Sequence, residues 1–204
     1  MVRSSGKPAH HANLTSLTAG WFNHCVPIAL AALLYCAPLF SKADDQLVTE
    51  YRIKAAFLYN FSRFIGWPDA ITQTGRFTIC VLGVDPFGDA LDTLAGKRIQ
   101  DSTLDIRRLP AAADMDDCRL AYISESESDR VVDILASVGA RPILTVSDTA
   151  DFAERGGIIR LKLVDKKVRF DINTDAAQRA GLSISSKLLS LATIVRDTKT
   201  SKVR

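Results

Sequence analysis

FTICVLG, residues 77–83, is a continuous apolar run that includes three β-branched side chains. A strand buried on both faces has this composition, whereas a strand with one wet face alternates apolar and polar residues. Both faces of a strand are buried when helices connect parallel strands and cover the sheet on each side. Residues 77–83 therefore predict a central strand of a parallel α/β sheet.

Strand-like and helix-like segments surround this run. Strands are expected at 104–109, 119–124 and 142–148, and helices at 45–66, 86–96, 128–139 and 149–157. The first of these helices has apolar residues at spacings of three and four, and it ends before Trp67 and Pro68. Strands interleaved with helices predict an open, mostly parallel sheet.

The pattern changes at residues 157–173, GIIRLKLVDKKVRFDIN, where apolar and polar residues alternate. Such alternation predicts a β-hairpin with one buried and one wet face, which turns near Asp165 and Lys166. Asn173 is expected to cap a final helix at about 174–196. The predicted fold class is a single-domain α/β fold, a mostly parallel sheet flanked by helices, with a C-terminal β-hairpin and a terminal helix.

The first 43 residues have the order of a secretory signal. Arg3 and Lys7 precede an apolar run at 25–40, and cleavage is expected between Ala43 and Asp44. The alternative is an uncleaved anchor, although a run of about sixteen residues is short for a span of about twenty. We expect export to the periplasm with three segments: a signal peptide at 1–43, an α/β domain at 44–197 and a flexible tail at 198–204.

Removal of the leader changes the charge balance of the chain. Three of the 26 Lys and Arg residues lie in the leader and all 23 Asp and Glu residues follow it, so the exported chain has no net formal charge. This neutrality argues against nucleic acid as a partner. All three histidines also lie in the leader. A histidine-based nucleophile therefore has no base, and ordinary zinc sites lose their commonest ligand. This favours a protein that is not an enzyme and holds no metal.

Two cysteines, Cys80 and Cys118, follow the leader. An even pair in an oxidising compartment usually forms a disulfide. Closing a loop of about forty residues would contribute about 4 kcal/mol to stability in the chain-entropy account. The alternative is a pair of buried free thiols.

Five aromatic side chains crowd residues 54–68, KAAFLYNFSRFIGWP. Polar residues interrupt the segment too often for a membrane span, and a neutral domain does not favour stacking on nucleic acid. Packing in the core is the main expectation, and a surface for self-association or for a partner is the alternative.

Acidic residues follow two of the buried strands. Asp85 and Asp148 lie where α/β proteins place ligands, and with Ser124 they outline a possible ligand cleft. Paired carboxylates could hold Mg²⁺ or act as acid and base. Because each Asp also precedes a predicted helix, capping is the simpler interpretation.

Basic residues alternate along one face of the predicted hairpin. Arg160, Lys162 and Arg169 are the candidates for binding an acidic partner, because they project from stiff strands. A merely solvated face is the alternative.

Four segments resemble, in order, the YfiR-like proteins. They are EYRIKAAFLYNFSRFIGWP (50–68), FTICVLGVDPFG (77–88), PILTVSD (142–148) and VRFDINTDAAQRAGLSISSKLLSLA (168–192). The resemblance implies an exported α/β protein without catalytic activity or cofactor, and similar proteins form dimers with stabilising disulfides. Some also have a second cysteine pair after the fourth strand, where this chain has Phe152 and no cysteine.

The resemblance also implies partners. It predicts a periplasmic regulator that represses an inner-membrane diguanylate cyclase in envelope or redox stress signalling, so that cyclic-di-GMP and biofilm formation are controlled. An OmpA-like outer-membrane lipoprotein would sequester the regulator. The alternatives are a periplasmic small-molecule sensor that uses the cleft at Asp85, Ser124 and Asp148, and a carboxylate-dependent hydrolase.

Overall fold

The computed structural model describes residues 41–68, 75–110 and 115–197, with side chains described from Asp45 onward. The chain divides into two units, Met1–Asp44 and Asp45–Arg204, and the second unit contains the α/β domain. The predicted signal peptide lies outside the described residues except for its last three, and the predicted tail at 198–204 lies wholly outside them.

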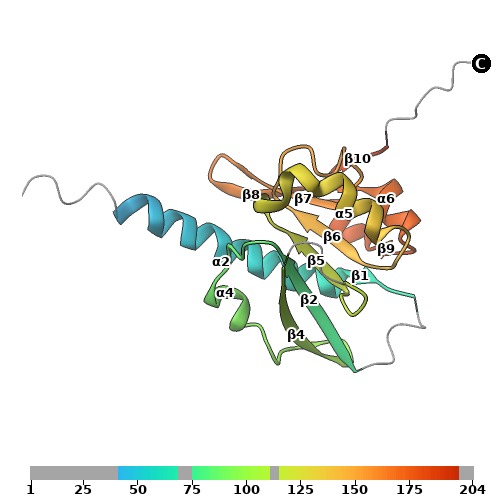
Figure 1. Cartoon of the computed structure of the whole chain (residues 1–204), viewed down its shortest axis with the longest axis horizontal. Helices are drawn as coiled ribbons and strands as arrows, with labels where there is room; N and C mark the ends of the chain where they lie inside the picture. Colours follow the sequence, from blue (N-terminus) through green and yellow to red (C-terminus); the bar gives the residue numbers. More distant parts are fainter. Residues whose placement is uncertain (1–40, 69–74, 111–114, 198–204) are drawn as a thin grey trace, which may run out of the picture. The chain divides into compact units, whose positions relative to one another are not determined.

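An eight-stranded sheet forms the centre of this α/β domain (Figure 1). Its strands, in spatial order, are β10 (Thr193–Val195), β8 (Lys167–Asn173), β7 (Ile159–Val164), β6 (Leu144–Ser147), β5 (Leu120–Ile123), β2 (Arg76–Leu82), β4 (Ser102–Leu109) and β3 (Arg98–Ile99). Two short strands, β1 (Ile65–Gly66) and β9 (Ser183–Ile184), pair separately.

Most neighbouring strands run parallel. Among the described strands of this sheet, only the β7–β8 and β3–β4 pairs are antiparallel. β2 lies inside the sheet between β4 and β5, and six of its seven residues are buried. The predicted α/β class with a mostly parallel sheet is therefore confirmed, and so is the central position of residues 77–83.

Helices cover both faces of the sheet. They are α2 (Ser41–Phe64), α4 (Asp89–Asp92), the 3₁₀ helix η1 (Glu125–Arg130), α5 (Val131–Val138), α6 (Thr174–Arg179) and α7 (Ser186–Leu189). Val81 packs in a core cluster with α2, whereas the next residue of β2, Leu82, packs in a second cluster with α5. Because successive side chains of a strand point to opposite faces, α2 and α5 cover opposite sides.

The aromatic helix packs in the core, which confirms the main expectation for this segment. Leu58 and Phe61 are fully buried, and the ring centroids of Phe61 and Phe170 lie 5.2 Å apart. Trp67 meets Phe77 edge-on at 5.0 Å. Among the described residues, no helix is long and apolar enough to cross a membrane.

The hairpin also forms as predicted, with β7 and β8 joined at Asp165 and Lys166. Both turn residues have positive φ, 50° and 59°. This geometry belongs to the tight turns whose twist matches that of the flanking strands.

The segment after the hairpin differs from the prediction. Asn173 caps α6 by accepting a hydrogen bond from the Ala176 amide at 2.9 Å, but α6 ends at Arg179 instead of near residue 196. Gly181 follows in a left-handed conformation (φ 65°), which interrupts the helix. The β-branched run at 193–195 then joins β8 as a parallel strand.

Two other helices are shorter than expected. Within 86–96 only Asp89–Asp92 is α-helical, and 149–157 forms turns instead of a helix. Asp151 adopts a positive φ of 55°, which a helix does not allow.

Candidate functional site

The outer face of the hairpin carries the three cations that were predicted to bind a partner. In the β7–β8 register Arg160 pairs with Asp171, and Lys162 pairs with Arg169. All four side chains alternate with the core residues Leu161 and Phe170, so they lie on the opposite face.

Asp171 changes the interpretation of this face. It is 2% exposed, and the Lys162 Nζ lies 2.6 Å from its Oδ1, with the Arg160 guanidinium 3.8 Å from its Oδ2. The side chains of Arg160 and Lys162 are only 22% and 29% exposed. A buried carboxylate needs such partners, because an unpaired charge away from water is costly.

The expectation that all three cations project freely into solvent is therefore wrong. Arg160 and Lys162 neutralise Asp171, whereas Arg169 and its neighbour Lys167 are exposed. The sequence held a signal for this arrangement. A two-residue turn at Asp165 and Lys166 sets a register in which residue 160 lies opposite residue 171 on the other strand. Opposite charges at such a pair of positions attract. Whether this face binds a partner stays a prediction.

The strand-end residues occupy one edge of the sheet. Asp85, Ser124 and Asp148 follow β2, β5 and β6, which are neighbours, so their location was predicted correctly. Asp85 accepts hydrogen bonds from the Phe87 amide and from the Arg108 Nε, both at 2.7 Å. The Phe87 contact is a local turn. Asp85 does not cap the following helix as expected, because Gly88 is the N-cap of α4 and no side chain caps that helix.

Ser124 and Asp148 are shielded from solvent. Ser124 is 4% exposed and precedes η1. Asp148 binds two side chains of α2, accepting from the Lys54 Nζ at 2.6 Å and from the Tyr51 hydroxyl at 2.9 Å on the same oxygen, Oδ2. A small ligand at these carboxylates would have to displace their cations, so their use as a ligand cleft stays a prediction that the contacts do not favour.

Four residues around Asp148 form a compact cluster, which we call the Asp148 cluster: Tyr51, Lys54, Tyr122 and Asp148. Lys54 is buried and also pairs with Glu50 at 2.7 Å. The Tyr122 hydroxyl and Asp148 Oδ1 are both buried without a hydrogen-bond partner of normal geometry among the described residues.

The charges of the cluster shift its pKa values away from neutrality. Burial alone would raise the pKa of Asp148, but Lys54 and the two tyrosine hydroxyls hold it below its ordinary value. Burial opposes the charge of Lys54, yet the hydrogen bonds to Asp148 and Glu50 raise its pKa. Burial and the charge of Asp148 raise the pKa of Tyr51 to about 12.

These shifts decide what the cluster can do. General acid–base catalysis works best with a pKa near the working pH, and the shifts move these groups away from it. The cluster instead fastens α2 to the carboxyl end of β6. Sequence reasoning missed this contact, although Lys54 lies within the apolar stripe of its helix, between Tyr51 and Leu58. In the described parts of the chain, no group of three or more His, Cys, Asp or Glu could hold a metal ion.

The two cysteines that follow the predicted leader are joined. Cys80 of β2 and Cys118, just before the neighbouring strand β5, form a disulfide with a Cα–Cα distance of 5.8 Å. Both are buried in the core cluster that contains α5. The predicted disulfide is present, and the free-thiol alternative is wrong.

Comparison with known families gives the same assignment as the residue motifs. A family model described as YfiR/HmsC-like matches residues 51–193. The chain belongs to the YfiR/HmsC-like family. The match runs from Tyr51 in α2 to Thr193 in β10, and so covers nearly all of the described domain. No curated protein matches the chain significantly.

In this YfiR/HmsC-like chain, the segment that follows β6 contains a buried aromatic residue. Phe152 is fully buried, and its ring lies so close to Gly157 that a Cβ there would be 2.1 Å from a ring carbon. The segment at 149–157 is therefore held by packing.

Proposed function

We propose that this protein is an exported, non-enzymatic regulator that binds and represses a membrane signalling protein, a diguanylate cyclase. Family membership over residues 51–193 carries the proposal, because repression of such a cyclase is the function that the resemblance to YfiR-like proteins implies. The buried disulfide supports a location in an oxidising compartment such as the periplasm.

The hairpin supplies the surface for the cyclase in this proposal. Arg169 and Lys167 provide exposed positive charge on a strand, and Arg160 and Lys162 are already ordered by Asp171. Ordered side chains lose little entropy on binding. Charge complementarity with an acidic periplasmic domain would set the orientation and speed of association. An OmpA-like lipoprotein would then compete for the regulator, which would act as a homodimer.

The test is genetic and biochemical. Deletion of the gene should raise cellular cyclic-di-GMP, and expression of the chain in trans should restore the lower level. The protein should also copurify with the periplasmic domain of a membrane diguanylate cyclase of its host. Unchanged cyclic-di-GMP after deletion, together with no binding to any periplasmic cyclase domain of the host, would refute the proposal.

A further inference from the structure

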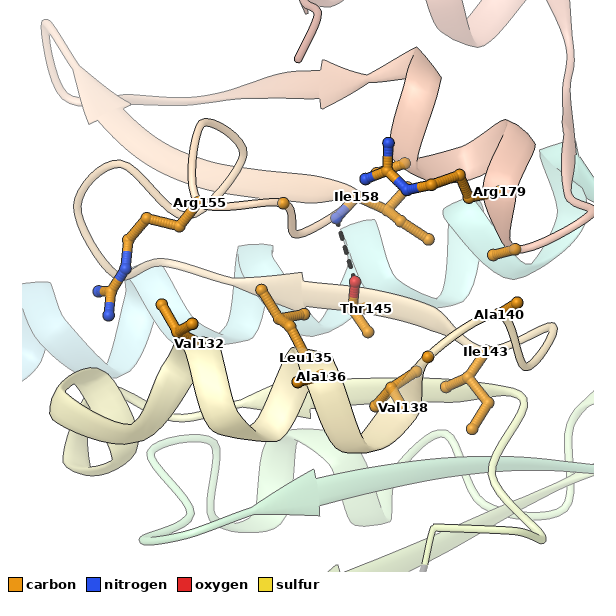
Figure 2. Close-up of a pocket in the computed structure, with 14 residues that line it drawn as sticks. Val132, Leu135, Ala136, Val138, Ala140, Ile143, Thr145, Arg155, Ile158 and Arg179 are labelled. Atoms are coloured by element: carbon orange, nitrogen blue, oxygen red, sulfur yellow. Dashed lines mark hydrogen bonds between the residues drawn. The ribbon is translucent and has the colours of Figure 1, made fainter. Parts of the chain in front are cut away.

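A pocket of about 370 Å³ lies between α5 and α6, beside the amino end of β7 (Figure 2). This volume is at the lower end of the range for small-molecule sites. The strand-end residues Asp85, Ser124 and Asp148 do not line it. The pocket is therefore distinct from the cleft that the sequence suggested.

Apolar side chains form most of the lining. Val132, Leu135 and Ala136 line it from α5, and Ile143 and Ile158 come from the segments before β6 and β7 (Figure 2). Val132 is 55% exposed, so part of this apolar surface faces water. Covering such surface with an apolar group is favourable by about 25 cal/mol per Å².

The polar group at the centre of the lining already has a partner. The Thr145 hydroxyl accepts a hydrogen bond from the Ile158 amide at 3.0 Å, drawn as a dashed line in Figure 2. An apolar group packed there would leave neither atom of this bond unsatisfied. The pocket therefore suits the apolar body of a ligand.

Two arginines stand at opposite ends of the pocket, Arg155 on the side of Val132 and Arg179 on the far side (Figure 2). Arg179 already forms an ion pair with Asp197. Arg155 is half-buried and donates to the Ser128 carbonyl at 3.0 Å, and within the described ranges it has no carboxylate partner. A guanidinium has five N–H donors in a planar fork, which leaves Arg155 able to bind a carboxylate.

We propose that this pocket binds a small aliphatic carboxylate. The carboxylate pairs with Arg155, and the aliphatic body lies along Leu135, Ile143 and Ile158. The site goes beyond the regulatory function proposed above and would give the regulator a metabolite input. It does not depend on which protein the hairpin binds.

Isothermal titration calorimetry of the purified protein with octanoate tests the site. We expect saturable binding with a Kd of about 0.1–1 mM, in keeping with the affinity that a ligand of this size can reach. Octan-1-ol lacks the charge and acetate lacks the body, so each should bind at least about tenfold more weakly. No saturable binding of octanoate up to about 10 mM would overturn the proposal, as would equal binding of octan-1-ol.

Three variants locate the ligand within the protein. Arg155→Gln should weaken octanoate binding about tenfold or more, because a charged hydrogen bond is lost. Ala136→Phe should block the pocket, and its exposed position on α5 leaves the fold intact. Arg52→Gln, at an exposed arginine on α2, is the matched control and should bind like the parent. Parental affinity in either Arg155→Gln or Ala136→Phe would overturn the assignment, with circular dichroism as the check on folding.

Discussion

The role of a charged residue in this protein depends on whether it contacts a buried group of opposite charge. Arg160 and Arg169 look alike in the alternating hairpin pattern, yet Arg160 neutralises buried Asp171 and Arg169 is exposed. Reversal of the charge at Arg160 would put a carboxylate beside Asp171. Only Arg169 and Lys167 can therefore be used to test the hairpin as an interface without disturbing its fold.

Charge reversal at both exposed residues, Lys167→Glu with Arg169→Glu, should leave the melting temperature within about one degree, because exposed substitutions change stability little. It should weaken binding of the cyclase periplasmic domain, and more strongly at low salt. Arg98→Glu on β3, at the other end of the sheet, is the control. Unchanged affinity in a pull-down or by surface plasmon resonance would move the interface away from the hairpin.

Lys54, unlike Lys167 and Arg169, is a buried cation. Its removal should lower the stability of the folded protein rather than weaken binding of a partner. Lys54→Met leaves Asp148 uncompensated, so the free energy of unfolding should fall by about 3–5 kcal/mol. Denaturation with urea measures this loss. Lys97→Met, at an exposed lysine, should change stability by less than about 0.5 kcal/mol. If Lys54→Met lowered the free energy of unfolding by as little as Lys97→Met, the Asp148 cluster would not be what holds α2 to the sheet.

The same cluster predicts how stability depends on pH. The pKa of Asp148 is lowered in the folded protein, so its contribution is fully present above its ordinary value of 3.8. That contribution is lost as the pH falls below 3.8 through the folded pKa. Urea midpoints of the parent protein should therefore drop over this acid range, and Asp148→Asn should show a smaller drop. An equal drop of the urea midpoint in the parent and in Asp148→Asn would contradict a stabilising role for the Asp148 carboxylate.

Elements were predictable where their pattern is local. Residues 77–83 and 157–173 form the expected strand and hairpin because burial on both faces, or on one, leaves a direct mark on the sequence. The region 174–196 was predicted wrongly as one helix. Its apolar spacing fits a helix, but pairing with β8 draws 193–195 into the sheet. Contacts between distant segments overrode local preference there.

The turn at 149–157 depends on a close contact that the local sequence pattern does not predict. Gly157 lies against the ring of Phe152, so Gly157→Ala should force the ring or the backbone to move and lower the melting temperature by several degrees. Calorimetry measures this change. Adding Phe152→Leu to the variant should recover part of the loss if the clash with the ring is its cause. No recovery would point to the backbone of the turn instead.

At the scale of the whole molecule, the mostly parallel sheet could be inferred from the sequence. The contact that holds α2 against the end of β6 could not. Tyr51 and Lys54 meet Asp148 across 97 and 94 positions of sequence. Spacing within a helix indicates which side is buried, yet it does not say what that side will meet. The candidate hairpin residues were located correctly on one face, whereas their exposure depended on the burial of Asp171. The pocket between α5 and α6 had no counterpart in the sequence, because its lining comes from four separate segments.

The disulfide joins β2 to the segment just before β5, and its burial leads to a prediction about redox behaviour. Cys80 and Cys118 are at most 1% exposed, so a thiol reductant cannot reach them while the domain is folded. Mass spectrometry after alkylation should find the bond intact in native protein treated with dithiothreitol and reduced when urea is added. Replacement of both cysteines by alanine should lower the free energy of unfolding by about 2–5 kcal/mol. Rapid reduction of the folded protein would instead identify this bond as a redox switch, since opening of the core would then be frequent enough to expose it.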